Sequence, residues 1–444
     1  MINDTIVALA TPNMKSAISM LRVSGDEAIE IVDNIFTKSL KEVESHTIHY
    51  GYIKDHGEKI DEVLVSVFRA PKSFTTEDVV EISTHGGVAI SRKVLNLLLS
   101  KGARLANAGE FTQRAYLHGR IDMIEVEAIN DMIDAKTEKA ATLAMSGLSK
   151  QTTNLIQQFK EELLQIIAVI EVNIDYPEYD DVKELSNQEV KNALLKFKKD
   201  IEYIIKNSKT SNMIKNGIKV AIVGLPNAGK SSLLNAFLET DKAIVTDVEG
   251  TTRDVLEAEY LLNGINLIFL DTAGIRDTTD IVESIGIKKA KTTMDNADLI
   301  LLVVDASKPK LDLFEEKLIK DKSDKVMIVL NKTDIANNIQ IDGIKISALN
   351  QDIENLKTKM IERLDLDIDI TSESLFLANQ RHLALLNKIN SSIDQALSSI
   401  EMQVPADLVV SDIEEAYEYL QELLGLQYKE SLLDELFSRF CLGK

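Results

Sequence analysis

The sequence is short of cysteine and of positive charge, and it contains no long apolar run. Cys441 is the one cysteine among 444 residues, which excludes an internal disulfide and fits a reducing compartment. No stretch approaches the ~20 consecutive apolar residues of a membrane-spanning helix, and no basic region precedes an apolar stretch at the N-terminus. We therefore expect a cytoplasmic protein without a signal peptide or a membrane span.

Acidic residues outnumber basic ones. The chain has 50 lysines and arginines against 71 aspartates and glutamates, which gives a formal net charge of −21. Because attraction to phosphates supplies most of the non-specific affinity for nucleic acid, so acidic a chain is a poor stand-alone binder of DNA or RNA. If its substrate is a nucleic acid, we expect a basic partner protein to supply most of the grip.

The histidines and the single cysteine do not indicate a particular chemistry. Three of the six histidines, His46, His49 and His56, lie near one another without a cysteine or a tight acidic partner, so they predict no metal site. At the C-terminus, fraying is the expected state of the last residues. A thiol nucleophile at Cys441, assisted by Lys444, is the alternative, although no histidine lies near it in sequence to act as a base.

A phosphate-binding loop follows a short apolar run. Residues 218–223 have the character of a buried strand, residues 224–231 spell GLPNAGKS, and a helical pattern continues from 232 to 238. This strand–loop–helix context predicts a P-loop, in which glycines let backbone N–H groups face phosphate oxygens. The lysine supplies charge to the outer phosphates and the serine hydroxyl can hold Mg²⁺. The predicted contacts are Asn227, Ala228, Gly229, Lys230, Ser231 and Ser232.

Further motifs, in order, indicate a guanine nucleotide. A DTAG motif follows the apolar strand 267–270, an NKTD motif follows strand 326–330, and a Ser-Ala pair follows strand 344–346. The Asp334 carboxylate can accept two hydrogen bonds from the N1–H and 2-amino groups of guanine, and adenine offers no such pair of donors. The predicted contacts are Asp271, Thr272, Ala273, Gly274, Asn331, Lys332, Asp334, Ser347 and Ala348.

The segment between the P-loop and Asp271 is polar and contains glycine. It offers a switch threonine, Thr252, as a second Mg²⁺ ligand beside Ser231. Its carbonyl groups, together with the Asn227 side chain, could also cage a monovalent cation near the phosphates. The predicted contacts in this segment are Thr246, Asp247, Val248, Glu249, Gly250, Thr251 and Thr252.

The residue after the DTAG motif cannot orient the attacking water. Many small GTPases carry a glutamine there, and this chain carries Ile275. Glu283 is a plausible replacement in the same segment, although its spacing alone favours an ordinary solvated glutamate at a helix start.

The chain is too long for one ordinary domain, and its patterns predict a multidomain α/β plus α fold. Residues 1–118 are mixed α/β, 119–213 are helical, 214–370 form a doubly wound α/β domain with the P-loop, and 371–444 are helical again. In the first part we expect strands at 5–9, 19–23, 62–68 and 79–83, and helices at 26–36 and 88–99. Pro177 predicts a helix end nearby. The simplest architecture is one discontinuous helical domain with the GTPase domain inserted.

Motifs spread along the whole chain point to a family. They are DTIVA at 4–8, LRVSG at 21–25, EDVVE at 77–81, GEFT at 109–112, GTTRD at 250–254 and the ending FCLGK at 440–444. With the PNAGKS loop, they make the chain resemble, over its whole length, the MnmE (TrmE) family of tRNA modification GTPases.

The resemblance implies the functions of the terminal domains. In this family the N-terminal domain dimerises and binds a 5-formyl- or related tetrahydrofolate. The folate-binding residues of the family match Arg22, Glu81, Arg120 and Lys444. A carboxylate suits the pterin donor edge, and cations suit the acidic tail of folate.

The resemblance also implies a catalytic cycle. Family members are K⁺-activated, and the positions that match their cation cage are Asn227, Thr246, Val248 and Thr251. Glu283 matches their water-orienting acid, and Lys230 serves beside it in catalysis. The family forms a heterotetramer with an MnmG-type protein that uses FAD and NADH. The two proteins build aminomethyl or carboxymethylaminomethyl groups at C5 of the wobble uridine in certain tRNAs, and the tRNA is expected to be held mostly by the partner.

Two other functions stay open at this point. A regulatory GTPase of ribosome assembly would be a binding switch without RNA chemistry, and it predicts a basic RNA-binding appendage that the sequence does not show. A one-carbon transferase regulated by GTP predicts that the N-terminal domain turns over formyl-folate alone. GTP hydrolysis that drives a conformational change in tRNA modification is the function we expect.

Overall fold

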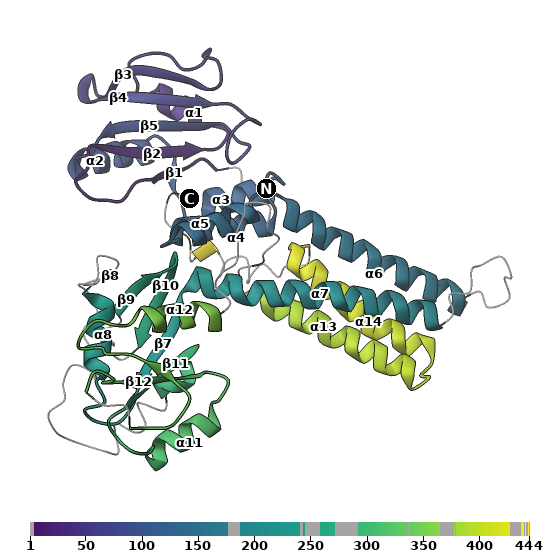
Figure 1. The fold of residues 1–444 in the computed structure, drawn as a ribbon. Coiled ribbons are helices and arrows are strands. Elements are labelled where there is room, and N and C mark those ends of the chain that lie inside the picture. The colour runs from purple at the N-terminus through teal and green to yellow at the C-terminus, as the bar shows by residue number, and fades with distance from the viewer. Residues whose placement is uncertain are drawn as a thin grey trace. The chain divides into compact units, whose positions relative to one another are not determined.

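The structure is a computed structural model, and Figure 1 labels its helices and strands. By its internal contacts the chain divides into two compact units. The first unit comprises residues 1–130, 156–164 and 417–444, and the second comprises 131–155 and 165–416. Within them the structure describes residues 4–175, 187–239, 243–244, 258–270, 292–335, 338–364, 377, 379–426, 437, 438, 440 and 443.

The first unit is built on a six-stranded sheet in the order β3-β4-β5-β2-β1-β6. Neighbouring strands are antiparallel, except that β1 and β6 are parallel. The strands are β1 (Ile6–Leu9), β2 (Ile18–Ser24), β3 (Thr47–Asp55), β4 (Glu58–Phe68), β5 (Val79–His85) and β6 (Arg104–Leu105).

One face of this sheet is covered by α1 (Ala28–Asp33) and α2 (Val88–Ser100). Alternate strand residues such as Leu21, Val65 and Ile82 form the core beneath these helices. The strands and helices expected in residues 1–118 are therefore confirmed. Three elements of this stretch were missed: β3, β6 and the helix α3 (Glu110–Leu117). β3 is half exposed and alternates Thr, His and Tyr with apolar residues, so its pattern lacks the apolar run that marks a buried strand. Among the described residues no group of three or more His, Cys, Asp or Glu side chains could hold a metal ion.

The second unit contains a seven-stranded sheet in the order β13-β12-β11-β7-β10-β9-β8. β10, β7, β11, β12 and β13 are parallel, and β9 and β8 extend the sheet antiparallel. The strands are β7 (Ile218–Val223), β8 (Ala243–Ile244), β9 (Ala258–Leu262), β10 (Ile265–Leu270), β11 (Leu299–Asp305), β12 (Val326–Asn331) and β13 (Ile344–Lys345).

Helices cover both faces of this second sheet. α8 (Lys230–Leu238) and α12 (Glu354–Arg363) contribute to the core on one face. α11 (Leu313–Asp321) contributes Leu318 to the core on the other. The doubly wound α/β arrangement expected from the sequence is therefore present, and the apolar strands predicted before each motif lie at their predicted places.

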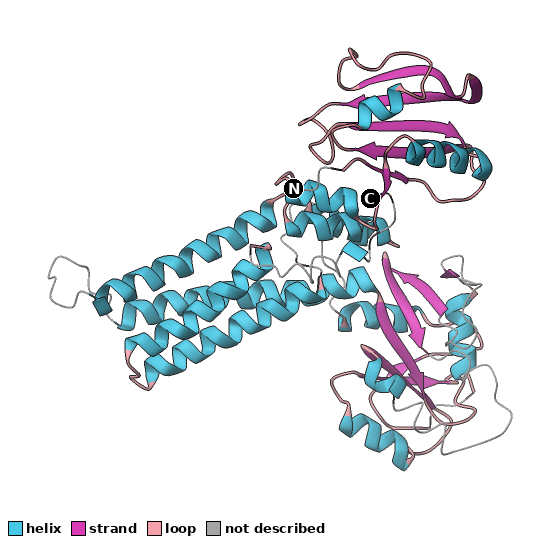
Figure 2. Cartoon of the chain, turned by 180° about the vertical axis from the view of Figure 1, so that it is seen from behind, coloured by secondary structure: helices cyan, strands magenta, loops and turns pink. Residues whose placement is uncertain are grey.

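The remaining described chain is largely helical, and Figure 2 shows these helices in cyan. α7 runs alongside α13, and both belong to the second unit. α6 is described as far as Asp175, and Pro177, where a helix end was predicted, lies outside the described residues. In the described part of the chain no helix is both long and apolar enough to cross a bilayer. The helices are α3 (Glu110–Leu117), α4 (Met123–Asp134), α5 (Glu138–Gly147), α6 (Gln151–Asp175), α7 (Asn187–Asn216), α13 (Gln380–Glu401) and α14 (Ala406–Leu424).

Candidate nucleotide site

The loop between β7 and α8 needs both of its terminal glycines. Gly224 has φ +158°, and a Cβ placed there would collide with the Val303 carbonyl oxygen. Gly229 is left-handed, with φ +98°, and a Cβ on it would strike the Asn331 side chain. The backbone can therefore pass close to β11 and β12 only with glycine at these two positions.

Lys230 begins α8 and reaches back across the loop. Its Nζ donates hydrogen bonds to the Gly224 carbonyl at 3.0 Å and the Leu225 carbonyl at 2.9 Å. Burial lowers the pKa of Lys230 below its usual value, and neutral carbonyls compensate its charge only in part. Phosphate oxygens, placed at the N-terminus of α8, would compensate that charge far better.

Asn331 joins the P-loop to the loop after β13. Its side chain is only 3% exposed. Its Nδ2 donates to the Ala228 carbonyl at 2.9 Å, and its Oδ1 accepts from the Ala348 backbone N–H at 3.0 Å. Both halves of the amide are therefore used to hold the phosphate loop and the Ser-Ala loop together. The sequence predicted Asn331 as a nucleotide contact and did not predict this bridging role.

We expect Asn331→Ala to loosen both loops at once. The substitution leaves two buried backbone groups without their partner, at roughly 1–3 kcal/mol each. GTP affinity should fall at least tenfold, together with a lower thermal unfolding temperature of the nucleotide-binding part. Isothermal titration with GTP checks this, and Asn338→Ala, which removes an exposed amide bonded to the Ser307 carbonyl, is the control. Equal effects of the two substitutions would contradict the bridging role.

Asp334 is exposed at the end of the same motif and is oriented by Ser347. The Ser347 hydroxyl donates to Asp334 Oδ1 at 2.7 Å. Lys332, two residues before Asp334, has φ +65°, and its Nζ lies 2.7 Å from Asp305 Oδ2. Burial alone would raise the pKa of Asp305, but hydrogen bonds from Lys332 and Ser307 outweigh it, so this pKa lies below its usual value. The base-recognition carboxylate and its flanking lysine are thus both held in place.

These loops lie at one edge of the sheet. Because β7, β11, β12 and β13 are parallel, the loops that follow β7, β12 and β13 emerge at their shared carboxyl ends. That edge is where open α/β sheets bind their ligands. The structure therefore brings together the predicted P-loop residues, Asn331 to Asp334, and Ser347 with Ala348.

Other predicted residues are placed only in part. Ser231 and Ser232 lie half exposed in the first turn of α8, and Asn227 is exposed with φ +63°. The hydroxyl oxygen of Ser231, beside Lys230, is the kind of atom that ligates Mg²⁺. The amide oxygen of Asn227 is the kind of atom that ligates K⁺. Several residues considered in the sequence analysis lie outside the part of the chain that the structure describes. They are Thr246, Asp247, Val248, Glu249, Gly250, Thr251, Thr252, Asp271, Thr272, Ala273, Gly274, Glu283, Cys441 and Lys444.

The first unit brings three predicted folate residues together around an aromatic ring. Arg22 and Glu81 face each other across β2 and β5, with Arg22 Nε donating to Glu81 Oε1 at 2.8 Å. Arg120 lies over the ring of Phe74, 4.9 Å from its centroid, and donates to the Phe74 carbonyl. The Arg22 guanidinium lies 5.9 Å from the same ring, and Arg22 also donates to the Gly443 carbonyl at 3.3 Å.

A buried charge network below this cluster escaped the sequence prediction. The Arg114 side chain is 1% exposed and forms ion pairs with Asp4 at 2.7 Å, Glu77 at 3.0 Å and Glu110 at 3.0 Å. Arg104 adds pairs to Asp4 and Glu110. The network ties the N-terminal strand, α3 and the segment that carries Phe74 into one assembly, and its members are scattered over 110 residues, so no local motif announces it.

We expect Arg114→Met to destabilise the first unit by ~3–5 kcal/mol, because it leaves the largely buried Glu77 carboxylate without this cation and Glu110 with Arg104 alone. Amide hydrogen exchange in β1 and α3 reports the local free energy of opening. The control is Lys359→Ala, which breaks an exposed pair with Glu362 and should cost no more than ~1 kcal/mol. Indistinguishable exchange rates in Arg114→Met and the unaltered protein would sink this expectation.

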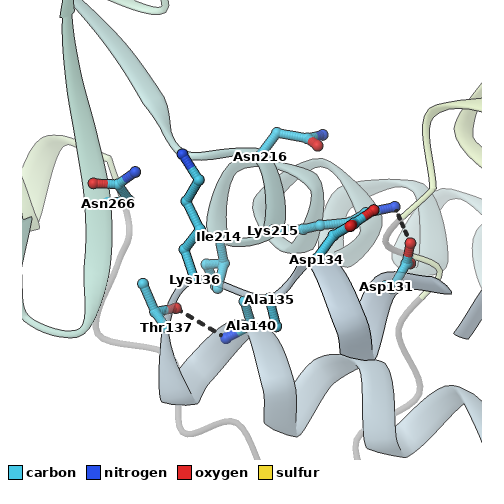
Figure 3. A pocket seen from close by; sticks show the side chains of 10 residues that line it. All are labelled: Asp131, Asp134, Ala135, Lys136, Thr137, Ala140, Ile214, Lys215, Asn216 and Asn266. Carbon is cyan, nitrogen blue, oxygen red and sulfur yellow. Dashed lines mark hydrogen bonds and ion pairs between the residues drawn. The ribbon is translucent and has the colours of Figure 1, made fainter. Parts of the chain in front are cut away.

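A cavity of about 220 Å³ lies elsewhere in the second unit, between the α4–α5 connection, the end of α7 and β10 (Figure 3). Lys215 Nζ lies 2.6 Å from Asp131 Oδ1 in its wall, and Lys136 Nζ lies 2.6 Å from Glu259 Oε1. Asn266 faces the cavity from the start of β10, which pairs with the start of β7. The cavity therefore lies at the amino end of the strands, opposite the nucleotide loops.

The comparisons with known proteins agree along the whole chain. A family model described as the GTP-binding protein TrmE N-terminus matches residues 5–120, and one described as the MnmE helical domain matches 123–441. The tRNA modification GTPase MnmE of Streptococcus thermophilus is 45% identical over 450 residues, covering 99% of this chain and 98% of that protein. The protein of the same name from Bacillus pumilus is 43% identical over 464 residues, covering 99% and 100%.

Among solved structures, the G domain of the T. maritima FeoB iron transporter is 26% identical and covers 33% of this chain and 98% of that one. Its TM-score of 0.26 is too low to add to what the sheet order shows. The two family models and the full-length relatives decide the assignment, and the nucleotide loops described above fit it. This chain is a GTP hydrolase that belongs to the MnmE family.

Proposed function

We propose that this GTPase takes part in modifying C5 of the wobble uridine of certain tRNAs. The names of its relatives state tRNA modification for those proteins, and the position on the uridine comes from the family resemblance. The observation that carries the GTPase part is the cluster at the carboxyl edge of the sheet. There Asn331 ties the phosphate loop to the Ser-Ala loop, and Ser347 orients the Asp334 carboxylate.

The chain's own residues divide the work on GTP. Asp334 would accept from the guanine edge, while Lys230 and the N-terminus of α8 would hold the phosphates. Ser231 and Thr252 would hold Mg²⁺, which would supply positive charge to offset that of the phosphates. Glu283 would orient the attacking water in place of the missing glutamine, on the family resemblance.

A K⁺ ion would be held by Asn227 together with Thr246, Val248 and Thr251. We expect GTP turnover to fall when K⁺ is replaced by Na⁺ at constant ionic strength, because the cage that offsets developing charge fits the larger ion. Steady-state phosphate release in the two salts measures this. Asn227→Ala should abolish the difference between the salts, whereas equal rates for the unaltered protein would remove the cage from the account.

The N-terminal sheet supports the proposed homodimer. Its face opposite α1 and α2 exposes large apolar side chains, and Ile48, Tyr50 and Leu64 are each about half exposed or more. Registered pairs such as Tyr50 with Leu64 place these side chains together on β3 and β4. An uncovered sheet face of this kind marks a protein interface. The two protomers would meet here.

The folate donor would bind near Arg22, Glu81, Arg120 and Lys444. Arg22 and Arg120 flank the Phe74 ring, which gives an aromatic surface for a pterin beside two cations for its acidic tail. The MnmG-type FAD/NADH partner would supply the redox chemistry and much of the basic surface that a chain of net charge −21 lacks.

Nucleoside analysis of tRNA tests the function directly. Cells that lack this protein should lose the aminomethyl-type groups at C5 of the wobble uridine, and a copy of the unaltered chain should restore them. An Asp334→Asn copy, expressed at the same level, should fail. A normal nucleoside profile in the deletion strain would reject the proposed function and leave the ribosome-assembly switch as the better candidate.

A further inference from the structure

One helix carries a positive surface that contrasts with the charge of the whole chain. α7 contains seven lysines and three acidic residues, whereas the chain has a net charge of −21. Val190, Leu194, Phe197, Ile201, Ile204 and Ile205 are buried, and α13 packs against this helix. The other side of α7 is exposed, so its lysines form a surface rather than part of the core.

Four residues define this exposed surface, which we name the α7 basic face: Lys199, Tyr203, Lys206 and Lys209. They are three or four positions apart, so they follow one another along the same side of the helix. Ten residues of helix place the outer two lysines roughly 15 Å apart. Tyr203 lies between the lysines with 68% of its surface exposed, which is unusual for a large aromatic residue without a partner to cover it.

The lysines of the face differ from their neighbours on the same helix in their ion pairs. Lys191 is paired with Glu401, Lys198 with Asp394, and Lys215 with Asp131. Within the part of the chain that the structure describes, Lys199, Lys206 and Lys209 form no ion pair with a carboxylate. Glu202 is exposed on the same side of the helix, three residues after Lys199 and four before Lys206, and its Oε1 lies 3.6 Å from Lys198 Nζ. The face thus keeps an excess of positive charge, three lysines against one glutamate, for an external anion.

We propose that the α7 basic face binds the phosphate backbone of tRNA, an inference that rests on the proposed function. A row of lysines neutralises successive phosphates without reading sequence, and it releases counterions as it does so. The exposed aromatic ring favours RNA, because the unpaired bases of RNA loops stack on such rings. This contact would be made by the GTPase itself, in addition to the grip expected of the basic partner.

Two matched triple variants of the full-length protein test the inference. The first replaces Lys199, Lys206 and Lys209 with alanine. The second replaces Lys310, Lys317 and Lys320, exposed lysines on or just before α11 in the same unit, and so makes the same change in net charge. Binding of a fluorescently labelled tRNA transcript is followed by anisotropy over a range of KCl concentrations, and GTP turnover is measured in parallel.

The first variant should bind tRNA at least tenfold more weakly, and the slope of log affinity against log salt should fall by about 2–3, roughly 0.7–0.9 for each phosphate that is no longer neutralised. The second variant should bind like the unaltered protein, and turnover should be normal in both. Tyr203→Ala should weaken binding about fivefold or more without changing the slope, while Tyr203→Phe should retain it.

Other outcomes overturn the inference. Unchanged affinity and slope in the first variant would show that this surface does not bind RNA. An equal loss of affinity in both variants would show that the effect comes from the net charge of the protein and not from this surface. The unaltered protein failing to bind tRNA at every salt concentration would also overturn it. The proposed function would survive any of these results, because it is decided separately by the nucleosides of the deletion strain. Unchanged binding by Tyr203→Ala would remove the stacking contact.

Discussion

Replacing Asp334 with asparagine should convert this GTPase into one that prefers xanthosine triphosphate. The carboxylate accepts from the N1–H and the 2-amino group of guanine, and Ser347 fixes its orientation at 2.7 Å. An asparagine presents one acceptor and one donor, which matches the N1–H and C2 oxygen of xanthine and clashes with the guanine amino group. Sites built on paired hydrogen bonds reject a mismatched ligand on the order of 10⁴-fold, so GTP affinity should fall on that scale.

Competition titrations with GTP and xanthosine triphosphate measure the exchange. Ser347→Ala is the matched control, because it removes the hydrogen bond to Asp334 and leaves the carboxylate in place. It should weaken GTP binding by a factor of about 5–10, the value of one modest hydrogen bond, without any gain for the xanthine nucleotide. If Asp334→Asn binds GTP as tightly as the unaltered protein, the carboxylate does not recognise the base.

Replacing Glu283 with alanine should slow GTP hydrolysis by ~10²–10⁴-fold while nucleotide affinity stays nearly the same. That is the scale of a positioned acid or base. The reason is in the sequence: Ile275 stands where many GTPases have the glutamine that orients water, so another side chain must take that task. Glu283 lies in the same segment, and the family resemblance gives it this role.

Single-turnover hydrolysis with prebound GTP separates chemistry from binding and release. Asp280→Ala removes an equal charge three residues away and should leave the rate within a few-fold of normal. A normal rate in Glu283→Ala would exclude it as the water-orienting group. Equal losses in both variants would point to the charge of the segment rather than to one positioned carboxylate.

The nucleotide loops were predictable because each is a local signal. GLPNAGKS at 224–231 and NKTD at 331–334 each follow a short apolar strand, and parallel strands bring their carboxyl ends to one edge. The motifs did not predict which side-chain atoms form which hydrogen bonds. The Asn331 amide bonds the Ala228 carbonyl and the Ala348 N–H, which lie 103 and 17 residues away in the sequence, and that bridge depends on how these loops meet in the fold.

The first unit was harder to predict for a similar reason. Arg114, Asp4 and Glu77 come from three separate segments, and only the folded sheet places them within ion-pairing distance. Phe74 belongs to no periodic pattern, so nothing in the sequence marks it as the ring between Arg22 and Arg120.

The net charge of the whole chain also gave no sign of the α7 basic face. The total of −21 predicted that nucleic-acid contact would come mostly from a partner, since the total averages over faces of opposite sign. The lysines of α7 are spread through its sequence among apolar and acidic residues. Lys199, Lys206 and Lys209 lie on one exposed side, with Tyr203 between them, because the opposite side of α7 is buried.

The central claim is that the loops at the carboxyl edge of the second sheet form a guanine-nucleotide site. Calorimetric titration of the purified protein with GDP and with ADP, in a buffer that contains Mg²⁺ and K⁺, tests it most directly. The account predicts one saturable site for GDP in each chain and no detectable heat from ADP at the same concentrations. Equal binding of the two nucleotides, or none of either, would contradict it.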